Sequence, residues 1–318
     1  MRRTTRKCGS RGDAGAKVAK GLPTAVARKY PATFGHRRSM SIPFFINTRF
    51  NMVRPLGPDH QDKRGAPTNT PEWLERRFRL FEDFCLPSLK AQTDQDFTWL
   101  VLFSDRTPEP WRERIAAIQR DFPAFVPVFT RDGEEQPTRF RAELAQRLGP
   151  SAKHVITARI DNDDAFHREM VARTRAELAG HDDAFIVYLN GLQVDVDRGV
   201  VARLRKPANS FLARIGRIGN GPPPTVLDIY HHDVESTGRS RNIDTHPMWL
   251  QVIHSGNLQN EMRSGRVLFH ADLQRDFGIR SAVRIDLIGS LGAALGHYLW
   301  RRPVALLRHF LGRRSASG

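Results

Sequence analysis

The stretch VITARIDNDDAF, residues 155–166, joins a run of apolar and β-branched residues to three carboxylates within four positions. Such a run predicts a buried β-strand, and the abrupt change to acidic residues predicts where the strand ends. Side chains alternate between the two faces of a strand, so Asp161 and Asp163 would point the same way if the strand stayed extended. A divalent cation would relieve the repulsion between them, because Mg²⁺ and Mn²⁺ prefer oxygen ligands.

The same acidic residues also suit a purely structural role. The sequence Asp-Asn-Asp-Asp is typical of turns and helix N-caps, and a helix is expected to begin near Phe166. The sharp change from an apolar strand favours a functional site instead, because open α/β sheets bind ligands beyond the carboxyl ends of their strands.

Strands and helices alternate on both sides of this stretch. Apolar runs predict strands at 41–50, 97–103, 124–129, 154–160 and 184–189, and either a hairpin or a pair of short strands within 193–204. Apolar residues at helical spacing predict helices between these strands. The first follows Thr70, with Pro71 at its first position and a kink or restart at Pro87. This alternation predicts an α/β fold with a mostly parallel sheet and helices on both faces.

The positive charge of the chain lies at its two ends. The 318 residues carry a formal net charge of +16, of which residues 1–39 supply +10 and residues 298–318 supply +5. We therefore predict a disordered basic tail at 1–39, a folded domain at 40–280 and a basic, amphipathic helical extension at 281–318.

The sequence also bears on where the protein works. The only cysteines, Cys8 and Cys85, do not suggest a disulfide framework, and no secretory signal or membrane-spanning run is present. We expect a cytoplasmic protein whose basic ends make peripheral contact with the inner membrane surface.

Several motifs in consistent order carry a resemblance to a known family. They are TRFN at 48–51, CLPSL at 85–89, RIDNDD at 159–164 and WLQVIHSGN at 249–257. Together they resemble GT-A-type glycosyltransferases of the family-2 kind, and more closely the bacterial rhamnosyltransferase family, over about residues 45–260. The segment from Thr157 to Asp164 resembles the DxD motif of these enzymes.

The resemblance implies a GT-A-like domain that moves a sugar, here rhamnose, from a nucleotide-sugar donor to a polysaccharide or glycolipid acceptor. It implies a divalent metal, Mn²⁺ or Mg²⁺, that assists departure of the nucleoside diphosphate. The residues expected to bind the donor are Arg49, Asn51, Asp105, Arg159, Asp161 and His254. The residues expected to hold the metal are Asp161, Asp163 and His254.

An inverting transferase also needs a base that takes the proton of the acceptor hydroxyl. The Glu-Asp pair expected in such enzymes is not evident in the sequence. The nearest candidates are Asp233, Glu235 and Asp244, and the stereochemical course stays open at this point.

Two other classes of protein are compatible with parts of the sequence. A basic nucleic-acid-binding α/β protein would explain the net charge, but the middle of the chain is nearly neutral, so no nucleic-acid partner is expected. A Mg²⁺-dependent phosphatase of the dehalogenase type would explain Asp161 and Asp163. That chemistry calls for Thr or Val two residues after the second aspartate, where this chain has Ala165.

Overall fold

The computed structural model describes residues 42–53, 67–255, 262, 266–280 and 290–291. The predicted tail at 1–39 lies outside these residues, as does the predicted extension at 281–318 apart from Ser290 and Leu291. Both therefore stay predictions. None of the helices in the described part of the chain has the length and apolar character needed to cross a membrane.

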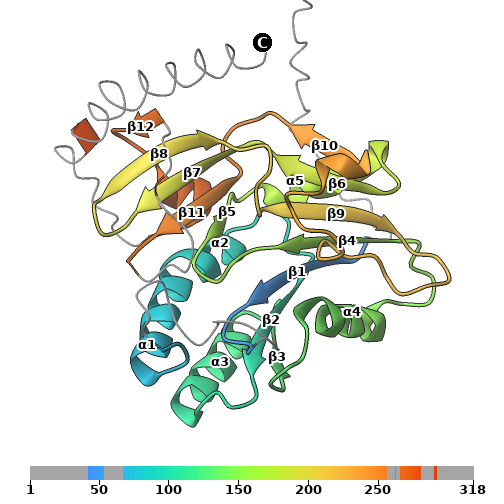
Figure 1. Cartoon of the computed structure of the whole chain (residues 1–318), viewed down its shortest axis with the longest axis horizontal. Helices are drawn as coiled ribbons and strands as arrows, with labels where there is room; N and C mark the ends of the chain where they lie inside the picture. The colour runs from blue at the N-terminus through green and yellow to red at the C-terminus, as the bar shows by residue number, and fades with distance from the viewer. Residues whose placement is uncertain (1–41, 54–66, 256–261, 263–265, 281–289, 292–318) are drawn as a thin grey trace, which may run out of the picture. The chain divides into compact units, whose positions relative to one another are not determined.

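The larger of two sheets has seven strands in the order β10-β6-β9-β4-β1-β2-β3 (Figure 1). These strands are β1 (Phe44–Arg49), β2 (Thr98–Ser104), β3 (Phe125–Thr130), β4 (His154–Arg159), β6 (Ala184–Tyr188), β9 (Leu212–Arg217) and β10 (Ser240–Ile243). All neighbours are parallel except β9, which runs antiparallel to both β4 and β6. The predicted mostly parallel sheet is thus confirmed, while β9 was not predicted.

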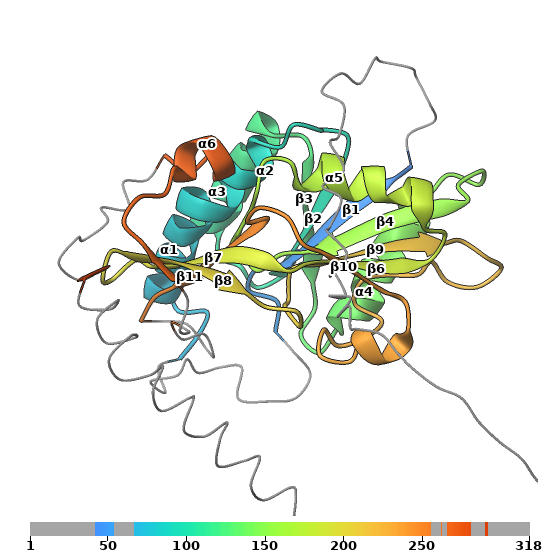
Figure 2. The same ribbon diagram turned by 90° about the horizontal axis from the view of Figure 1, so that it is seen from above.

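Helices cover both faces of this sheet, as the sequence predicts. The α-helices of the described chain are α1 (Pro71–Leu80), α2 (Leu86–Lys90), α3 (Glu109–Asp121), α4 (Gln136–Arg147), α5 (Met170–Ala176) and α6 (Leu273–Phe277), with short 3₁₀ turns at Glu177–Gly180 and Glu235–Thr237. Of these, α6 packs against strands of the smaller sheet. In β1, Ile46 packs in a cluster with residues of α1, α3 and α5. The residue before it, Phe45, faces the other side and packs in a cluster with Phe140 and Leu144 of α4. Figure 2 shows α4 on the opposite face of the sheet from α1, α3 and α5.

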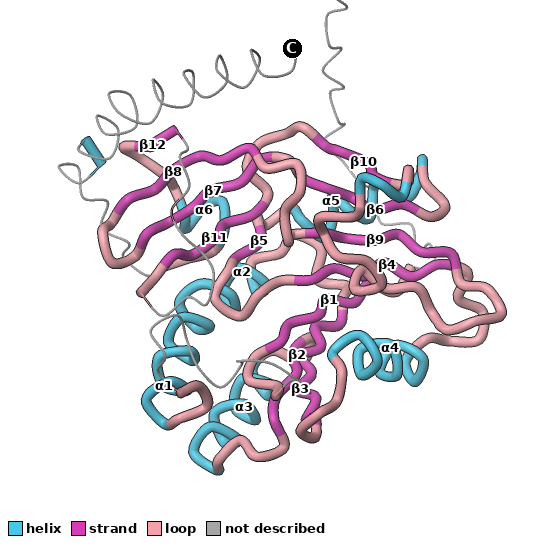
Figure 3. The backbone as a smooth tube through the Cα atoms, in the orientation of Figure 1, coloured by secondary structure: helices cyan, strands magenta, loops and turns pink. Residues whose placement is uncertain are grey.

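The smaller sheet has five strands in the order β12-β8-β7-β11-β5 (Figure 3). They are β5 (Ala165–Phe166), β7 (Asn190–Asp195), β8 (Val200–Arg205), β11 (Trp249–Ile253) and β12 (Arg266–Leu268). Of the two alternatives predicted within 193–204, the antiparallel pair β7–β8 is the hairpin. Because β5 begins directly after the acidic residues, the chain passes from the larger sheet to the smaller one through them.

The first helix begins as predicted, and the predicted restart at Pro87 is matched by α2, which begins at Leu86. Thr70 caps it by accepting a hydrogen bond from the backbone N–H of Trp73 at 3.3 Å, and Pro71 takes the first position. A π-helical segment, Phe81–Cys85, then leads directly into α2, which contains Pro87. Pro87 has no backbone N–H to donate to the preceding turn, and the wider π-helical turn accommodates it without an interruption of the helical backbone.

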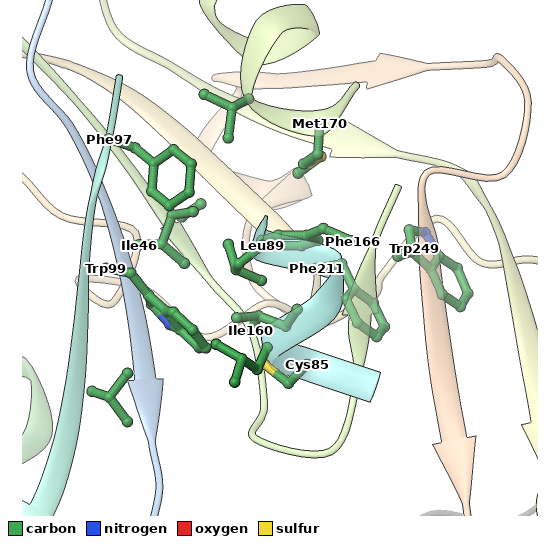
Figure 4. Packing of buried hydrophobic residues seen from close by; sticks show 14 of the residues in the cluster. Ile46, Cys85, Leu89, Phe97, Trp99, Ile160, Phe166, Met170, Phe211 and Trp249 are labelled. Atoms are coloured by element: carbon green, nitrogen blue, oxygen red, sulfur yellow. The ribbon is translucent and has the colours of Figure 1, made fainter. Parts of the chain in front are cut away.

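Aromatic side chains fill the space between the helices and the two sheets. Figure 4 shows Trp99, Phe166, Phe211 and Trp249 among the residues of this cluster. The rings of Phe211 and Trp249 are stacked, with centroids 4.7 Å apart, and the indole N–H of Trp249 donates to the backbone oxygen of Tyr188 at 2.9 Å. The indole of Trp249 also lies directly over Gly191 in the adjacent strand β7.

Replacing Gly191 by alanine should therefore destabilise the protein. An added Cβ would lie 2.0 Å from Cδ2 of Trp249, which is too close for any carbon contact. Overpacking of this kind costs about 1–3 kcal/mol, so the free energy of unfolding in urea should fall by that amount. Gly149→Ala is the matched control, because a Cβ there meets nothing within 4 Å. Equal stability of the two variants would contradict the close packing described here.

Candidate active site

The carboxyl ends of β1, β2 and β4 bring most of the predicted donor-binding residues to one edge of the larger sheet. Arg49 ends β1, and Asp105 directly follows β2, the parallel neighbour of β1. The amide of Asn162, in the turn after β4, donates to the backbone oxygens of Arg49 at 3.2 Å and Phe50 at 2.9 Å. These bonds tie the acidic turn to the end of β1.

Asn51 likewise connects the end of β1 to the end of β2 by hydrogen bonds. Its side-chain oxygen accepts a hydrogen bond from the backbone N–H of Ser104 at 3.1 Å, and its amide donates to Oγ1 of Thr107 at 3.1 Å. Asn51 is buried, so its contacts in the described structure are with the protein itself. It holds the edge of the sheet together beside the predicted donor site.

The acidic residues form a turn rather than a continuation of β4. The strand ends at Arg159, and the backbone N–H of Asp164 donates to the oxygen of Asp161 at 3.2 Å. The helix expected to begin near Phe166 is present but begins later: Phe166 belongs to β5, and α5 begins at Met170 with Glu169 at its N-cap. The acidic turn therefore caps no helix in the described chain, and its carboxylates need another explanation.

Asp163 lies at the centre of a buried polar cluster with Arg77 and His254. Nη1 of Arg77 donates to Oδ2 of Asp163 at 2.7 Å, and Nε2 of His254 lies 3.0 Å from the same oxygen. Burial alone would raise the pKa of Asp163, but the charge of Arg77 and the hydrogen bond from His254 outweigh it and hold that pKa well below its usual range. Asp163 is therefore ionised at neutral pH.

The sequence analysis did not identify Arg77, although the sequence contains a signal for it. Arg77 sits in α1 between Trp73 and Phe81, four residues from each, on the apolar face of the helix. A charged residue at helical spacing among buried aromatics needs a partner inside the protein. Here that partner is Asp163, eighty-six residues further along the chain.

Asp161 and Asp164 lie in different environments from Asp163. Asp161 is partly exposed and accepts a hydrogen bond from Nη2 of Arg159 at 3.2 Å. Asp164 is fully buried, and its Oδ1 accepts from the backbone N–H of Val252 in β11 at 2.9 Å. Burial, together with the charges of Asp163 and Asp161, raises the pKa of Asp164 well above its usual range. Asp164 is thus a neutral acid that anchors the strand carrying His254.

Of the three predicted metal ligands, the structure brings Asp163 and His254 into direct contact. Nε2 of His254 lies 3.0 Å from Oδ2 of Asp163, which is a hydrogen-bond distance. Among the described residues, Asp161 does not join them in a group whose ligand atoms all lie within 4.8 Å of one another. In the described structure the guanidinium of Arg77 supplies the positive charge at that carboxylate, and Arg159 supplies it at Asp161.

The candidate bases lie at two places, and all three are exposed. Asp244 follows β10 and accepts hydrogen bonds from Asn190 at 2.7 Å and Arg205 at 3.4 Å. Asp233 and Glu235 follow His231, whose pKa is lowered to about 4, first by burial and then by the positive charges of neighbours that include Arg159.

A mostly parallel sheet with charged side chains gathered at its carboxyl edge is typical of α/β proteins that bind a ligand at that edge. The particular family follows from comparison with known sequences. Residues 48–266 match the family described as "Putative rhamnosyl transferase", so the chain belongs to this family. The match confirms the predicted family and the predicted enzyme class, a glycosyltransferase. No curated protein matches the sequence.

Solved structures show only distant similarity. TarS 1-349 from S. aureus shares 8% identity at a TM-score of 0.36, over 66% of this chain and 60% of that chain. The same protein in complex with UDP-GlcNAc shares 9% identity at a TM-score of 0.39, over 68% of this chain and 60% of that chain. A structure from Bacillus anthracis, described as a putative glucose-1-phosphate thymidylyltransferase, shares 12% identity at a TM-score of 0.37, over 65% of this chain and 88% of that chain. No inference about substrate follows from similarities at this level.

Replacing Arg77 by methionine should strongly destabilise the fold. The change leaves the Asp163 carboxylate buried without its guanidinium partner, and breaking a buried ion pair in this way costs about 3–5 kcal/mol. Urea unfolding of Arg77→Met measures the loss, and the double variant Arg77→Met/Asp163→Asn should recover part of it. Arg79→Met, which breaks the exposed pair with Glu75, should stay close to wild type. Similar stabilities of the two single variants would show that Asp163 does not depend on Arg77.

Proposed function

We propose that this protein transfers a sugar from a nucleoside-diphosphate donor to a hydroxyl group of a glycan or glycolipid acceptor. The observation that carries the proposal is the cluster of Asp163, Arg77 and His254 beside the Arg159–Asp161 pair, at the carboxyl edge of the larger sheet. Two arginines and two carboxylates at one strand end suit a ligand that carries both phosphates and sugar hydroxyls.

The proposed reaction is a displacement at the anomeric carbon of the donor sugar. The acceptor oxygen forms a bond to that carbon, and the bond between the carbon and the diphosphate oxygen breaks. The nucleoside diphosphate leaves with the electron pair, and the acceptor proton passes to a carboxylate of the enzyme. Arg159 and Arg77 are fixed by their carboxylate partners, so their positive charges are in place to stabilise the leaving group.

The proposal includes a divalent cation, Mn²⁺ or Mg²⁺, held by Asp161, Asp163 and His254. When bound, such an ion would neutralise charge on the departing diphosphate. The ionised carboxylate of Asp163 supports this part of the proposal, and the cation would replace the hydrogen bond between Asp163 and His254. Arg77 keeps Asp163 ionised in either case, since its guanidinium donates to the same carboxylate oxygen.

Membership of the family suggests rhamnose as the sugar that is transferred. The proposed acceptor is a growing polysaccharide or a glycolipid. A cytoplasmic location, with peripheral contact to the membrane through the basic ends, would bring the enzyme to such an acceptor.

The proposed base for the acceptor proton is Asp233 or Glu235 rather than Asp244. The first two are exposed and follow a histidine that experiences the charges of Arg159 and Asp161. Asp244 is already engaged by Asn190 and Arg205.

A panel of nucleoside diphosphates and nucleotide sugars, each with and without Mn²⁺ or Mg²⁺, tests the donor site by thermal shift. One nucleotide family should raise the melting temperature of the wild type, more so with metal, because a ligand that binds only the folded state stabilises it. Asp161→Asn and Asp163→Asn should lose most of this shift and should lower transfer by about 100-fold or more. Circular dichroism without ligand checks that each variant is folded.

The matched control for these variants is Asp121→Asn, whose exposed carboxylate pairs with Lys90 away from the sheet edge. It should keep both the shift and the activity. An absence of any nucleotide-dependent shift in the wild type would overturn the donor site, and release of free phosphate instead of a transferred sugar would favour the phosphatase alternative.

The donor identified by this panel also allows the base to be tested. Removing a general base lowers the rate by about 10²–10⁴-fold, so either Asp233→Asn or Glu235→Gln should lower kcat by that factor with little change in KM for the donor. Asp244→Asn should keep kcat within a few-fold of wild type. The reverse pattern would assign the base to Asp244.

A further inference from the structure

A second cluster of side chains that can bind metal lies at the opposite end of the ladder between β5 and β11. These strands pair antiparallel, with Trp249 opposite Phe166 and Leu250 opposite Ala165. The end of β11 therefore brings His254 to the acidic turn before β5, whereas its start lies beside the residues that follow β5. The backbone N–H of His167 donates to the oxygen of Met248 at 3.0 Å, which fixes this second end.

The second cluster consists of His167, Glu169 and His246. Each offers one ligand atom, and these atoms all lie within 4.8 Å of one another. Nε2 of His246 lies 3.6 Å from Oε2 of Glu169, and the two imidazole rings have centroids 4.4 Å apart. Three ligands converge although His246 lies far from the other two in the sequence.

The surrounding residues hold the two histidines in place. His167 is buried, packs edge-on against Phe277, and its backbone oxygen accepts a hydrogen bond from the side chain of Gln92 at 2.9 Å. Nδ1 of His246 lies 3.3 Å from Oγ1 of Thr245. Nε2 of His246 is buried and has no hydrogen-bond partner. This nitrogen could therefore bind a metal without losing a hydrogen bond.

The electrostatic environment keeps both imidazoles available as ligands. Burial is the largest cause that lowers the pKa of His167, to about 4, and it also lowers the pKa of His246. A neutral imidazole has one lone pair that can bind a metal. Nδ1 of His167 accepts a hydrogen bond from the backbone N–H of Glu169 at 3.2 Å, so the ring would exchange this bond for the bond to the metal. Arg173 donates to Oε2 of Glu169 at 2.7 Å, and Asp276 of α6 adds a negative charge nearby. The arginine can keep this contact while the carboxylate binds a metal, as partners of metal ligands commonly do.

We propose that His167, Glu169 and His246 bind a Zn²⁺ ion at a site separate from the donor site. Two imidazoles and one carboxylate are ligands that suit Zn²⁺, whereas Mg²⁺ prefers oxygen ligands alone. A bound Zn²⁺ would join the residues before α5 to the segment that enters β11, and so brace the ladder from the end opposite His254. The proposal does not depend on the identity of the sugar donor.

Metal content and thermal stability of the full chain test this proposal. The protein is stripped with a chelator, dialysed, and titrated with Zn²⁺, and bound zinc is measured by mass spectrometry. The wild type should retain about one zinc per chain and should gain about 5–10 °C in melting temperature when free Zn²⁺ is 100-fold above the Kd. His246→Gln should lose both the zinc and the shift.

Three further variants keep the proposal falsifiable. His270→Gln removes an exposed histidine elsewhere and should behave like the wild type. His254→Gln removes a predicted ligand of the donor site and should keep the zinc, which separates the two sites. If His246→Gln folds poorly, Glu169→Gln offers a milder change, and the visible absorption of Co²⁺-loaded protein should be lost in it. Equal zinc content in wild type, His246→Gln and Glu169→Gln would overturn the proposal.

Discussion

The burial of the Asp163 carboxylate is the constraint on which much of the structure depends. A charge removed from water is tolerated only when it is paired and hydrogen-bonded, and Asp163 meets this requirement with Arg77 and His254. Arg77 comes from the helix layer, Asp163 from the end of the larger sheet and His254 from the end of β11 in the smaller sheet. One carboxylate thereby fixes the positions of three segments that are distant in the sequence.

The three neighbouring aspartates differ in ionisation and in contacts because they are buried to different degrees. Asp161 is partly exposed and open to a ligand, Asp163 is ionised through its buried partners, and Asp164 is neutral and holds β11. A turn after Arg159, rather than an extended strand, creates these differences because it directs successive side chains to different surroundings. The repulsion expected between two carboxylates is relieved by Arg159, which belongs to the same stretch, and by Arg77, which that stretch does not reveal.

The sequence predicts the parts of the fold that follow from local pattern. The apolar runs of β1, β2 and β4 and the capped start of α1 have the periodicity of their structures. Strand β9 was not predicted because LARIGR contains two arginines and a glycine; Arg214 is buried only through its pairs with Asp183 and Asp228. The start of α5 was expected near Phe166, before its actual start at Met170, because the strand partner of Phe166, Trp249, lies far along the chain. For the same reason, the partnership of Asp163 with Arg77 is a tertiary contact that no local pattern shows.

Strand β5 has only two residues, yet it separates the acidic turn from the cluster of His167, Glu169 and His246. Side chains on a strand change face with every residue, so its length sets both the spacing and the orientation of the groups at its two ends. A single inserted or deleted residue between Asp164 and His167 would turn one of the two clusters away from its partners on β11. We therefore expect this short, fully buried segment not to tolerate changes in length, unlike an ordinary surface connection.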